Sequence, residues 1–138
     1  MTRRDLIQKA FIGGASLIIL PYALKSCTKS NPGINGAGGD ITINLSDQGF
    51  SALNTPGGSV VLQGIIVAFK GNDVYLALDS VCTHQGCTIG YNLASNNFPC
   101  PCHGSVFSPS GSVLNGPATA PLKSYIVTKS GNILTITG

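Results

Sequence analysis

The sequence predicts an all-β domain, a small antiparallel sandwich or barrel, preceded by an N-terminal apolar leader. Short segments after the leader alternate apolar and polar residues with the period of two that a half-buried strand requires. No segment after the leader shows a helical period of 3.6, and the 18 glycines and 8 prolines interrupt the chain throughout. At 138 residues the chain therefore fits one domain and its leader.

The leader, residues 1–26, has the features of an export signal or a membrane anchor. Arg3-Arg4 near its start resembles a twin-arginine export signal, and an apolar stretch follows at residues 10–24. As a helix this stretch spans about 22 Å, short of the roughly 30 Å hydrocarbon core of a membrane. We expect export to the periplasmic side of the inner membrane. The alternative is a cytosolic protein with an incidental apolar N-terminus.

Cys27 begins a flexible Gly-rich tether at residues 27–39. Its place after the apolar stretch resembles a lipoprotein cleavage site, although Lys25 stands where a small or apolar residue is usual. We expect lipidation of Cys27; the alternatives are an uncleaved leader that acts as an anchor, and a free thiol or plain cleavage of the leader. The twelve residues 28–39, as a flexible coil, reach roughly 20 Å, so a tethered domain can meet different partners.

The predicted domain covers residues 40–138. The expected strands lie at residues 41–45, 60–62, 64–69, 74–78, 124–128 and 132–137. We expect tight turns at Gly71-Asn72 and Ser130-Gly131. Residues 80 to about 107 form an inserted subdomain, and the last two strands close the same sheets as the first four.

Both histidines and four of the five cysteines fall into two short segments of this insertion. The segments are Cys82-Thr83-His84-Gln85-Gly86-Cys87 and Cys100-Pro101-Cys102-His103-Gly104-Ser105. This clustering indicates one metal centre built from two loops. A structural zinc site is the first alternative, disfavoured by the C-x-H spacing and by the second pair of cysteines nested inside the first. A metal-free disulfide scaffold is the second, and it leaves the histidines unexplained.

The C-x-H and C-x-x-H pair resembles the Rieske 2Fe-2S proteins, specifically the disulfide-bearing branch of cytochrome bc-type and arsenite-oxidase-type proteins. The resemblance covers about residues 40–138 and implies a Rieske-like fold with one 2Fe-2S cluster per chain. It implies the following residues: the iron ligands Cys82 and Cys100 on one iron and His84 and His103 on the other, a disulfide between Cys87 and Cys102, and Gly86, Gly104, Ser105, Phe107 and Pro117 around the cluster.

Individual positions carry further expectations. Ser105 matches a family serine that donates to a bridging sulfide, and Pro117 lies in a loop that covers the cluster. Gln85 stands where quinol-oxidising members usually have an apolar residue, and Phe107 where they have tyrosine. The alternatives are that Ser105 is only a turn residue and Phe107 only a core residue.

Counting charges predicts the redox behaviour. Two ferric irons, two sulfides and two thiolates sum to zero, and the reduced cluster carries one negative charge. An all-cysteine cluster carries two more negative charges, so a mid-to-high potential is expected, roughly −150 to +300 mV.

The function predicted is one-electron relay between a periplasmic or membrane redox enzyme or cytochrome and a partner. The chain is an electron carrier by itself and has no catalytic residues, although it can be a subunit of an oxidoreductase complex. The alternative is a quinol-oxidising subunit of a cytochrome bc-type complex, which Gln85 disfavours; a ferredoxin component of an oxygenase is less favoured still. An oxygenase needs a second iron site with two more histidines, which the chain lacks. Residues 27–138 are formally neutral, so nothing indicates nucleic-acid binding.

Overall fold

The computed structural model describes residues 39–138. The predicted leader and Cys27 lie outside these residues. Within residues 39–138, no helix has the length and the apolar composition needed to cross a membrane.

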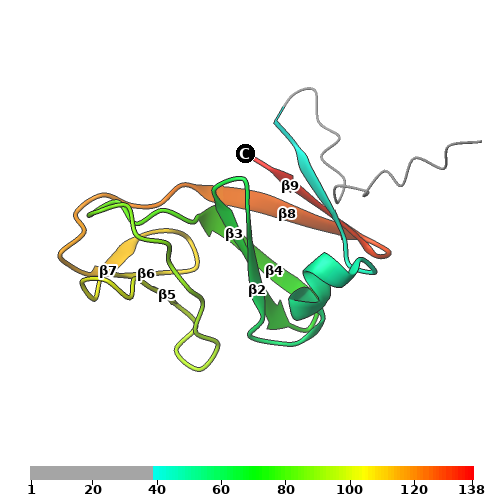
Figure 1. Cartoon of the computed structure of the whole chain (residues 1–138), viewed down its shortest axis with the longest axis horizontal. Helices are drawn as coiled ribbons and strands as arrows, with labels where there is room; N and C mark the ends of the chain where they lie inside the picture. Colours follow the sequence, from blue (N-terminus) through cyan, green and yellow to red (C-terminus); the bar gives the residue numbers. More distant parts are fainter. Residues whose placement is uncertain (1–38) are drawn as a thin grey trace, which may run out of the picture.

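Two antiparallel sheets form the domain (Figure 1), which confirms the all-β prediction. The larger sheet has six strands in the order β1-β9-β8-β4-β3-β2, and the smaller has the order β5-β6-β7. The strands of the larger sheet are β1 (Ile41–Asn44), β2 (Ser59–Leu62), β3 (Ile65–Gly71), β4 (Val74–Asp79), β8 (Ser124–Ser130) and β9 (Ile133–Thr137). Those of the smaller sheet are β5 (Phe98–Pro99), β6 (Val106–Phe107) and β7 (Val113–Asn115).

The C-terminal strands complete the larger sheet, as predicted. β8 pairs with β4 on one side and with β9 on the other, and β9 pairs with β1. The smaller sheet lies in the stretch between β4 and β8, and its last strand, β7, falls after residue 107.

Strand β3 explains why residues 65–68 are apolar without alternation. Ile65 and Val67 pack into one core and Ile66 and Ala68 into a second, so this strand is buried on both faces. The first core, the base core, lies between the larger sheet and the only helical segment of the described residues. The second, the loop core, joins β3 and β4 to the two Cys/His segments.

Both predicted turns are wrong by one residue. Gly71 pairs with Val74, so Asn72 and Asp73 form the first turn, with φ values of 51° and 59°. Two positive φ values are typical of the type I′ turn that joins antiparallel strands. The register shifts between Phe69 and Gly71, and this irregularity moves the turn along the chain. The second turn is Gly131-Asn132, since Ser130 pairs with Ile133.

A short 3-10 helix, η1 (Gln48–Asn54), was not predicted. It buries Phe50 and Leu53, which lie three residues apart and therefore on one face of a helix with three residues per turn. Two large apolar residues in seven give too weak a period to detect in the sequence. Figure 1 shows η1 at the end of the domain opposite the smaller sheet.

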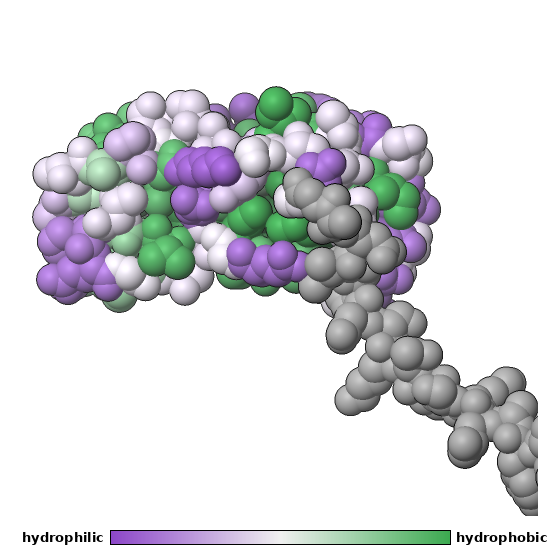
Figure 2. Space-filling view, turned by 90° about the horizontal axis from the view of Figure 1, so that it is seen from above, coloured by the Kyte–Doolittle hydropathy of each residue, from purple (hydrophilic) through white to green (hydrophobic). Residues whose placement is uncertain are grey.

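The surface mixes apolar and polar side chains rather than separating them, as Figure 2 shows for one face. Exposed large apolar residues occur on both the base and the loop end: Val61, Val74, Val81, Leu93, Leu114, Ile126 and Ile133.

Candidate metal centre

The first Cys/His segment is a tight loop that leaves β4. The backbone N–H of Cys82 donates to the carbonyl of Cys87 (2.7 Å), and the N–H of Gly86 donates back to the carbonyl of Cys82 (3.0 Å). Gly86 has a φ of 73°, a conformation that glycine adopts without strain. These two bonds close the loop and turn the residues between them, His84 included, outward.

The second segment repeats this pattern between β5 and β6. The N–H of Cys100 donates to the carbonyl of Ser105 (2.7 Å), and the N–H of Gly104 donates to the carbonyl of Cys100 (3.2 Å). Gly104 has a φ of 79°, like Gly86 in the first loop. The two loops are therefore alike in backbone, although their histidines stand at different positions within them.

Both thiols that the resemblance assigned to iron point into the loop core. Cys82 and Cys100 are buried, and neither takes part in a disulfide. Burial raises the pKa of the Cys82 thiol, but hydrogen bonds outweigh it and the net pKa is lowered. The bonding partners are the backbone of His84, the thiol of Cys100, the backbone of Gln85 and the side chain of Ser105. A thiol held in this way is suited to bind metal as thiolate.

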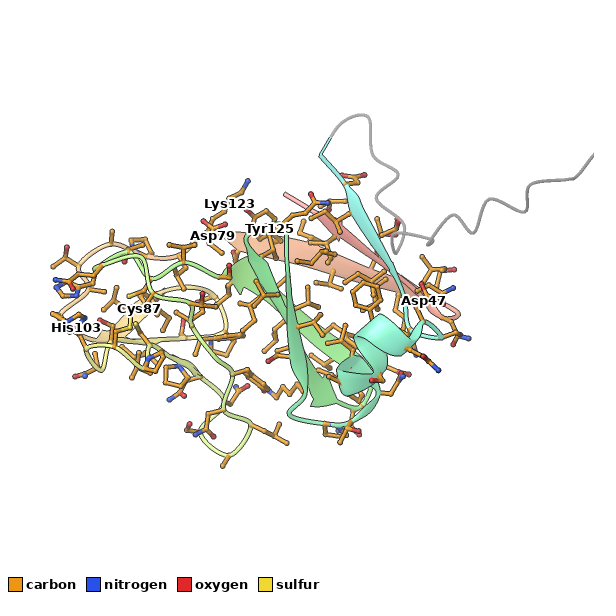
Figure 3. The ribbon with its side chains drawn as sticks, viewed as in Figure 1. Asp47, Asp79, Cys87, His103, Lys123 and Tyr125 are labelled. Carbon is orange, nitrogen blue, oxygen red and sulfur yellow. A yellow bond between two sulfur atoms is a disulfide. The ribbon has the colours of Figure 1, made fainter. Side chains whose placement is uncertain are left out.

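Both imidazoles lie on the outside. His84 and His103 are exposed, and their rings meet edge to face with centroids 5.0 Å apart. Figure 3 shows His103 at the tip of the domain, opposite the end that carries Asp47. The fold thus places a buried pair of thiols and an exposed pair of imidazoles at one end of the domain.

A disulfide joins Cys87 to Cys102 and links the two loops covalently, as the resemblance implied. Because Cys87 and Cys102 are bonded to each other, neither can form a disulfide with Cys82 or Cys100, and these two thiols and both imidazoles stay available.

Ser105 connects all three loops of this end. It is completely buried, and its hydroxyl accepts a hydrogen bond from the N–H of Ala118 (3.0 Å) and also bonds the Cys82 thiol. Phe107, two residues further, is completely buried in the loop core. The contact with Ala118 was not predicted, and it gives Ser105 a role in holding the third loop in addition to the donor role expected from the resemblance.

The third loop carries Pro117 and is tied to both Cys/His loops. The Asn115 amide donates to the carbonyl of Gly104 (3.0 Å), and the Thr83 hydroxyl donates to the carbonyl of Ala120 (2.7 Å). Pro117 itself is exposed and follows a cis peptide bond. Sequence reasoning missed Asn115 and Thr83, because a side chain that bonds a distant carbonyl leaves no local pattern.

These donors fit an iron-sulfur cluster. Within residues 39–138, no three His, Cys, Asp or Glu side chains converge on one point as a metal site. Two pairs of donors are what a two-iron cluster with bridging sulfides requires, since each iron takes two protein ligands. The buried side-chain N and O atoms of the described residues all have hydrogen-bond partners, so no buried polar side-chain group around the four candidate ligands lacks a partner.

Comparison with known proteins agrees with this geometry. The model of the Rieske [2Fe-2S] domain matches residues 45–126. The chain is 37% identical over 83 residues to the chloroplastic cytochrome b6-f complex iron-sulfur subunit of Bigelowiella natans, covering 51% of this chain and 33% of that protein. It is 28% identical over 149 positions to the cytochrome b6-f complex iron-sulfur subunit of Synechococcus sp., covering 96% of this chain and 84% of that protein.

Solved structures are similar as well. The plasma membrane Rieske protein PetC3 from Synechocystis PCC 6803 matches with a TM-score of 0.50 and 33% identity, over 59% of this chain and 85% of that one. The ferredoxin of carbazole 1,9a-dioxygenase from Nocardioides aromaticivorans, 21% identical with a TM-score of 0.53 over 60% of this chain and 86% of that one, shares the fold. The chain spans between a third and about three fifths of the length of its relatives from Bigelowiella natans and wheat. The match over residues 45–126 shows that the chain belongs to the Rieske [2Fe-2S] domain family and carries a 2Fe-2S cluster.

Proposed function

We propose that this chain is a membrane-tethered one-electron carrier whose cluster is held by Cys82 and Cys100 on one iron and by His84 and His103 on the other. The observation that carries the proposal is the separation of the two ligand pairs, with thiols in the loop core and imidazoles at the surface.

The surroundings of the thiols support their role as ligands. The bound cluster supplies a couple that takes up or releases one electron. The backbone N–H groups of His84 and Gln85 lie against the sulfur of Cys82, where they stabilise negative charge. Burial of both thiols excludes water from that side of the centre.

The exposed imidazoles support a role in exchange with a partner. His84 and His103 are the ligand side chains that another molecule can reach, because Cys82 and Cys100 are buried. The disulfide and the third loop hold the two histidine-bearing loops together, so the imidazoles keep the same arrangement when a partner binds and dissociates.

For the partner, we favour relay to a redox protein such as a cytochrome or an oxidoreductase subunit. Gln85, next to His84, is exposed and polar, which disfavours the apolar docking of a quinol. Quinol oxidation remains the second candidate, since relatives of this chain are iron-sulfur subunits of cytochrome b6-f complexes. The similarity to oxygenase ferredoxins concerns the fold alone.

For the location, we propose export to the periplasmic side of the inner membrane, with attachment through a lipid on Cys27 or through the uncleaved leader. The similar Synechocystis protein is described as a plasma membrane Rieske protein, which supports membrane association. The mass of the mature protein distinguishes the two attachments. A diacylglyceryl group at an N-terminal Cys27, lost in Cys27→Ser, supports lipidation, and a full-length chain supports the anchor.

Spectroscopy tests the ligand set. The reduced full-length protein should show the low average g-value of a Rieske centre in electron paramagnetic resonance, and iron analysis should give two irons per chain. His84→Ala and His103→Ala should each abolish the signal, whereas Gln85→Ala, a neighbouring exposed change, should retain it. One zinc per chain, or a signal that survives loss of either histidine, contradicts the proposal.

Purification from membranes tests the function. A cytochrome or oxidoreductase subunit that co-elutes with the protein and is reduced or oxidised by it supports relay. Co-elution with a cytochrome b-type subunit and quinol-dependent reduction support the second candidate.

A further inference from the structure

One end of the domain contains no acidic side chain and no lysine or arginine. Residues 80–122 contain no Asp, Glu, Lys or Arg. These residues include both Cys/His loops, the smaller sheet and the loop of Pro117, so we call them the uncharged end. The charged side chains of residues 39–138 all lie elsewhere: Asp40, Asp47, Lys70, Asp73, Asp79, Lys123 and Lys129.

The charges that border the uncharged end are themselves partnered. Asp79 accepts a hydrogen bond from the Tyr125 hydroxyl (2.7 Å), and the Lys123 ammonium lies 4.7 Å from the centre of the Tyr125 ring. Figure 3 shows these three residues well back from His103, at the junction with the larger sheet. Further away, Lys129 and Asp73 form an ion pair at 2.6 Å. Asp79 and Lys123 have opposite charges and both contact Tyr125, and Lys129 and Asp73 also have opposite charges, so each pair contributes little field at the tip.

The uncharged end still offers a surface for contact. Val81 is 49% exposed and Leu114 is 60% exposed, and Gln85 and Asn115 are exposed as well. The hydrophilic side chains of residues 80–122 are amides, hydroxyls and the two imidazoles. Apolar side chains among uncharged polar groups can form a specific interface without ion pairs.

We infer that this end docks a redox protein whose own docking face is uncharged, and that reduction of the oxidised protein there, with its neutral cluster, is nearly independent of ionic strength. The inference rests on the proposed function and adds the chemistry of the partner. A partner that brought a charge to this surface would lose hydration at that charge and find no counter-charge, at a net cost. Without opposite charges, encounter also lacks electrostatic steering, so salt has little to screen.

The experiment uses the full-length, cluster-loaded protein in nonionic detergent. Stopped-flow kinetics follow reduction of the oxidised protein, whose cluster is neutral, by two small reagents of opposite charge, ascorbate and hexaammineruthenium(II). Ionic strength is varied from about 10 mM to about 500 mM, which shortens the Debye length from about 30 Å to a few ångströms. A lysine-rich cytochrome c serves as a charged protein probe for the reduced form.

Glutamine offers a matched pair of variants. Gln85 is exposed beside His84, and Gln48 is exposed at the start of η1, at the opposite end of the domain. Gln85→Lys and Gln85→Glu place a charge at the tip, and Gln48→Lys and Gln48→Glu place the same charge far from it. The potential of each variant is measured alongside, so that driving force and electrostatic attraction are separated.

The wild-type rate with either small reagent should change less than about twofold over the salt range. At low salt, Gln85→Lys should react about threefold faster with ascorbate and more slowly with hexaammineruthenium(II), as expected for one added charge about 7 Å from the reagent in water. Gln85→Glu should show the opposite pattern and gain salt-sensitive exchange with cytochrome c. The Gln48 variants should behave like the wild type.

Other outcomes overturn the inference. A wild-type rate with cytochrome c that saturates at low salt and falls at high salt by much more than the one negative charge of the reduced cluster explains means that this end attracts a basic partner. Reduction that saturates with a soluble ubiquinol analogue in the absence of another protein means that the occupant is a quinol. Failure of the proposed function is distinct from these results: a protein without a Rieske signal, or one that exchanges no electron with either small reagent, shows it.

Discussion

Replacing Ser105 by alanine tests the most connected side chain of the metal centre. Ser105 is completely buried and its hydroxyl bonds both the Ala118 N–H and the Cys82 thiol. Because Ala118 is also buried, Ser105→Ala leaves its N–H without an acceptor, which costs about 1–3 kcal/mol. For a domain of this size, a loss of about 2 kcal/mol lowers the melting temperature by roughly 8–16 °C.

The same change affects the potential. A hydroxyl that donates to the Cys82 sulfur stabilises the more negative, reduced state, so its loss should lower the potential. If the two redox states differ by about 1 kcal/mol in this bond, the one-electron potential falls by roughly 40 mV.

Two measurements on the cluster-loaded protein check this prediction. Thermal unfolding followed by circular dichroism gives the stability, and redox titration at neutral pH gives the potential. Ser124→Ala, at an exposed position of β8, is the matched control and should leave both unchanged. Ser105→Ala with a stability within about 0.5 kcal/mol of the wild type refutes the assigned contact with Ala118.

Three further changes probe the rest of the domain. Cys87→Ser or Cys102→Ser opens a covalent loop of sequence separation 15 and should lower the free energy of unfolding by about 3 kcal/mol. The cluster should then be lost faster in air at moderate temperature, with an unchanged spectrum while it is present. An unchanged cluster lifetime means that the disulfide does not hold the loops. Phe107→Tyr should raise the potential by roughly 40 mV if its new hydroxyl reaches a ligating sulfur; an unchanged or lower potential with the cluster intact shows that this position is only core. The hydrogen bond to Asp79, together with burial, raises the pKa of the Tyr125 hydroxyl to about 12. Folding therefore stabilises the protonated hydroxyl, and this contribution to stability is complete below about pH 10 and is lost as the pH rises towards 12. Denaturant titrations at pH 8 and pH 11.5 should therefore show that Tyr125→Phe costs roughly 1 kcal/mol at pH 8 and less at pH 11.5, and an equal cost at both contradicts the assignment.

Local spacing was enough to predict the six strands of the larger sheet, but the three short strands of the smaller sheet were not predicted, and the ligand set of the metal centre stays a prediction. β1 and β9 alternate apolar and polar residues, and their positions and that of β4 were predicted to within a residue or two. The turn register was not predictable, because Gly71 favours a turn in the sequence but takes part in an irregular strand pair in the fold. The helix η1 was missed for a similar reason: its two buried residues, Phe50 and Leu53, show their common face only when they are packed on the base core.

By itself the sequence determined which residues are available for the cluster, since both histidines and four cysteines fall into two loops whose glycines permit the turns. It also determined that residues 80–122 bring no charge to that end. Only the tertiary structure decided that Cys82 and Cys100 point into the loop core while His84 and His103 face solvent. The backbone bonds of the two loops do not decide whether the cysteines or the histidines face the core. The apolar faces of β3 and β4 favour the arrangement with the cysteines inside, because burying a thiol costs little and burying an unpaired imidazole costs much more.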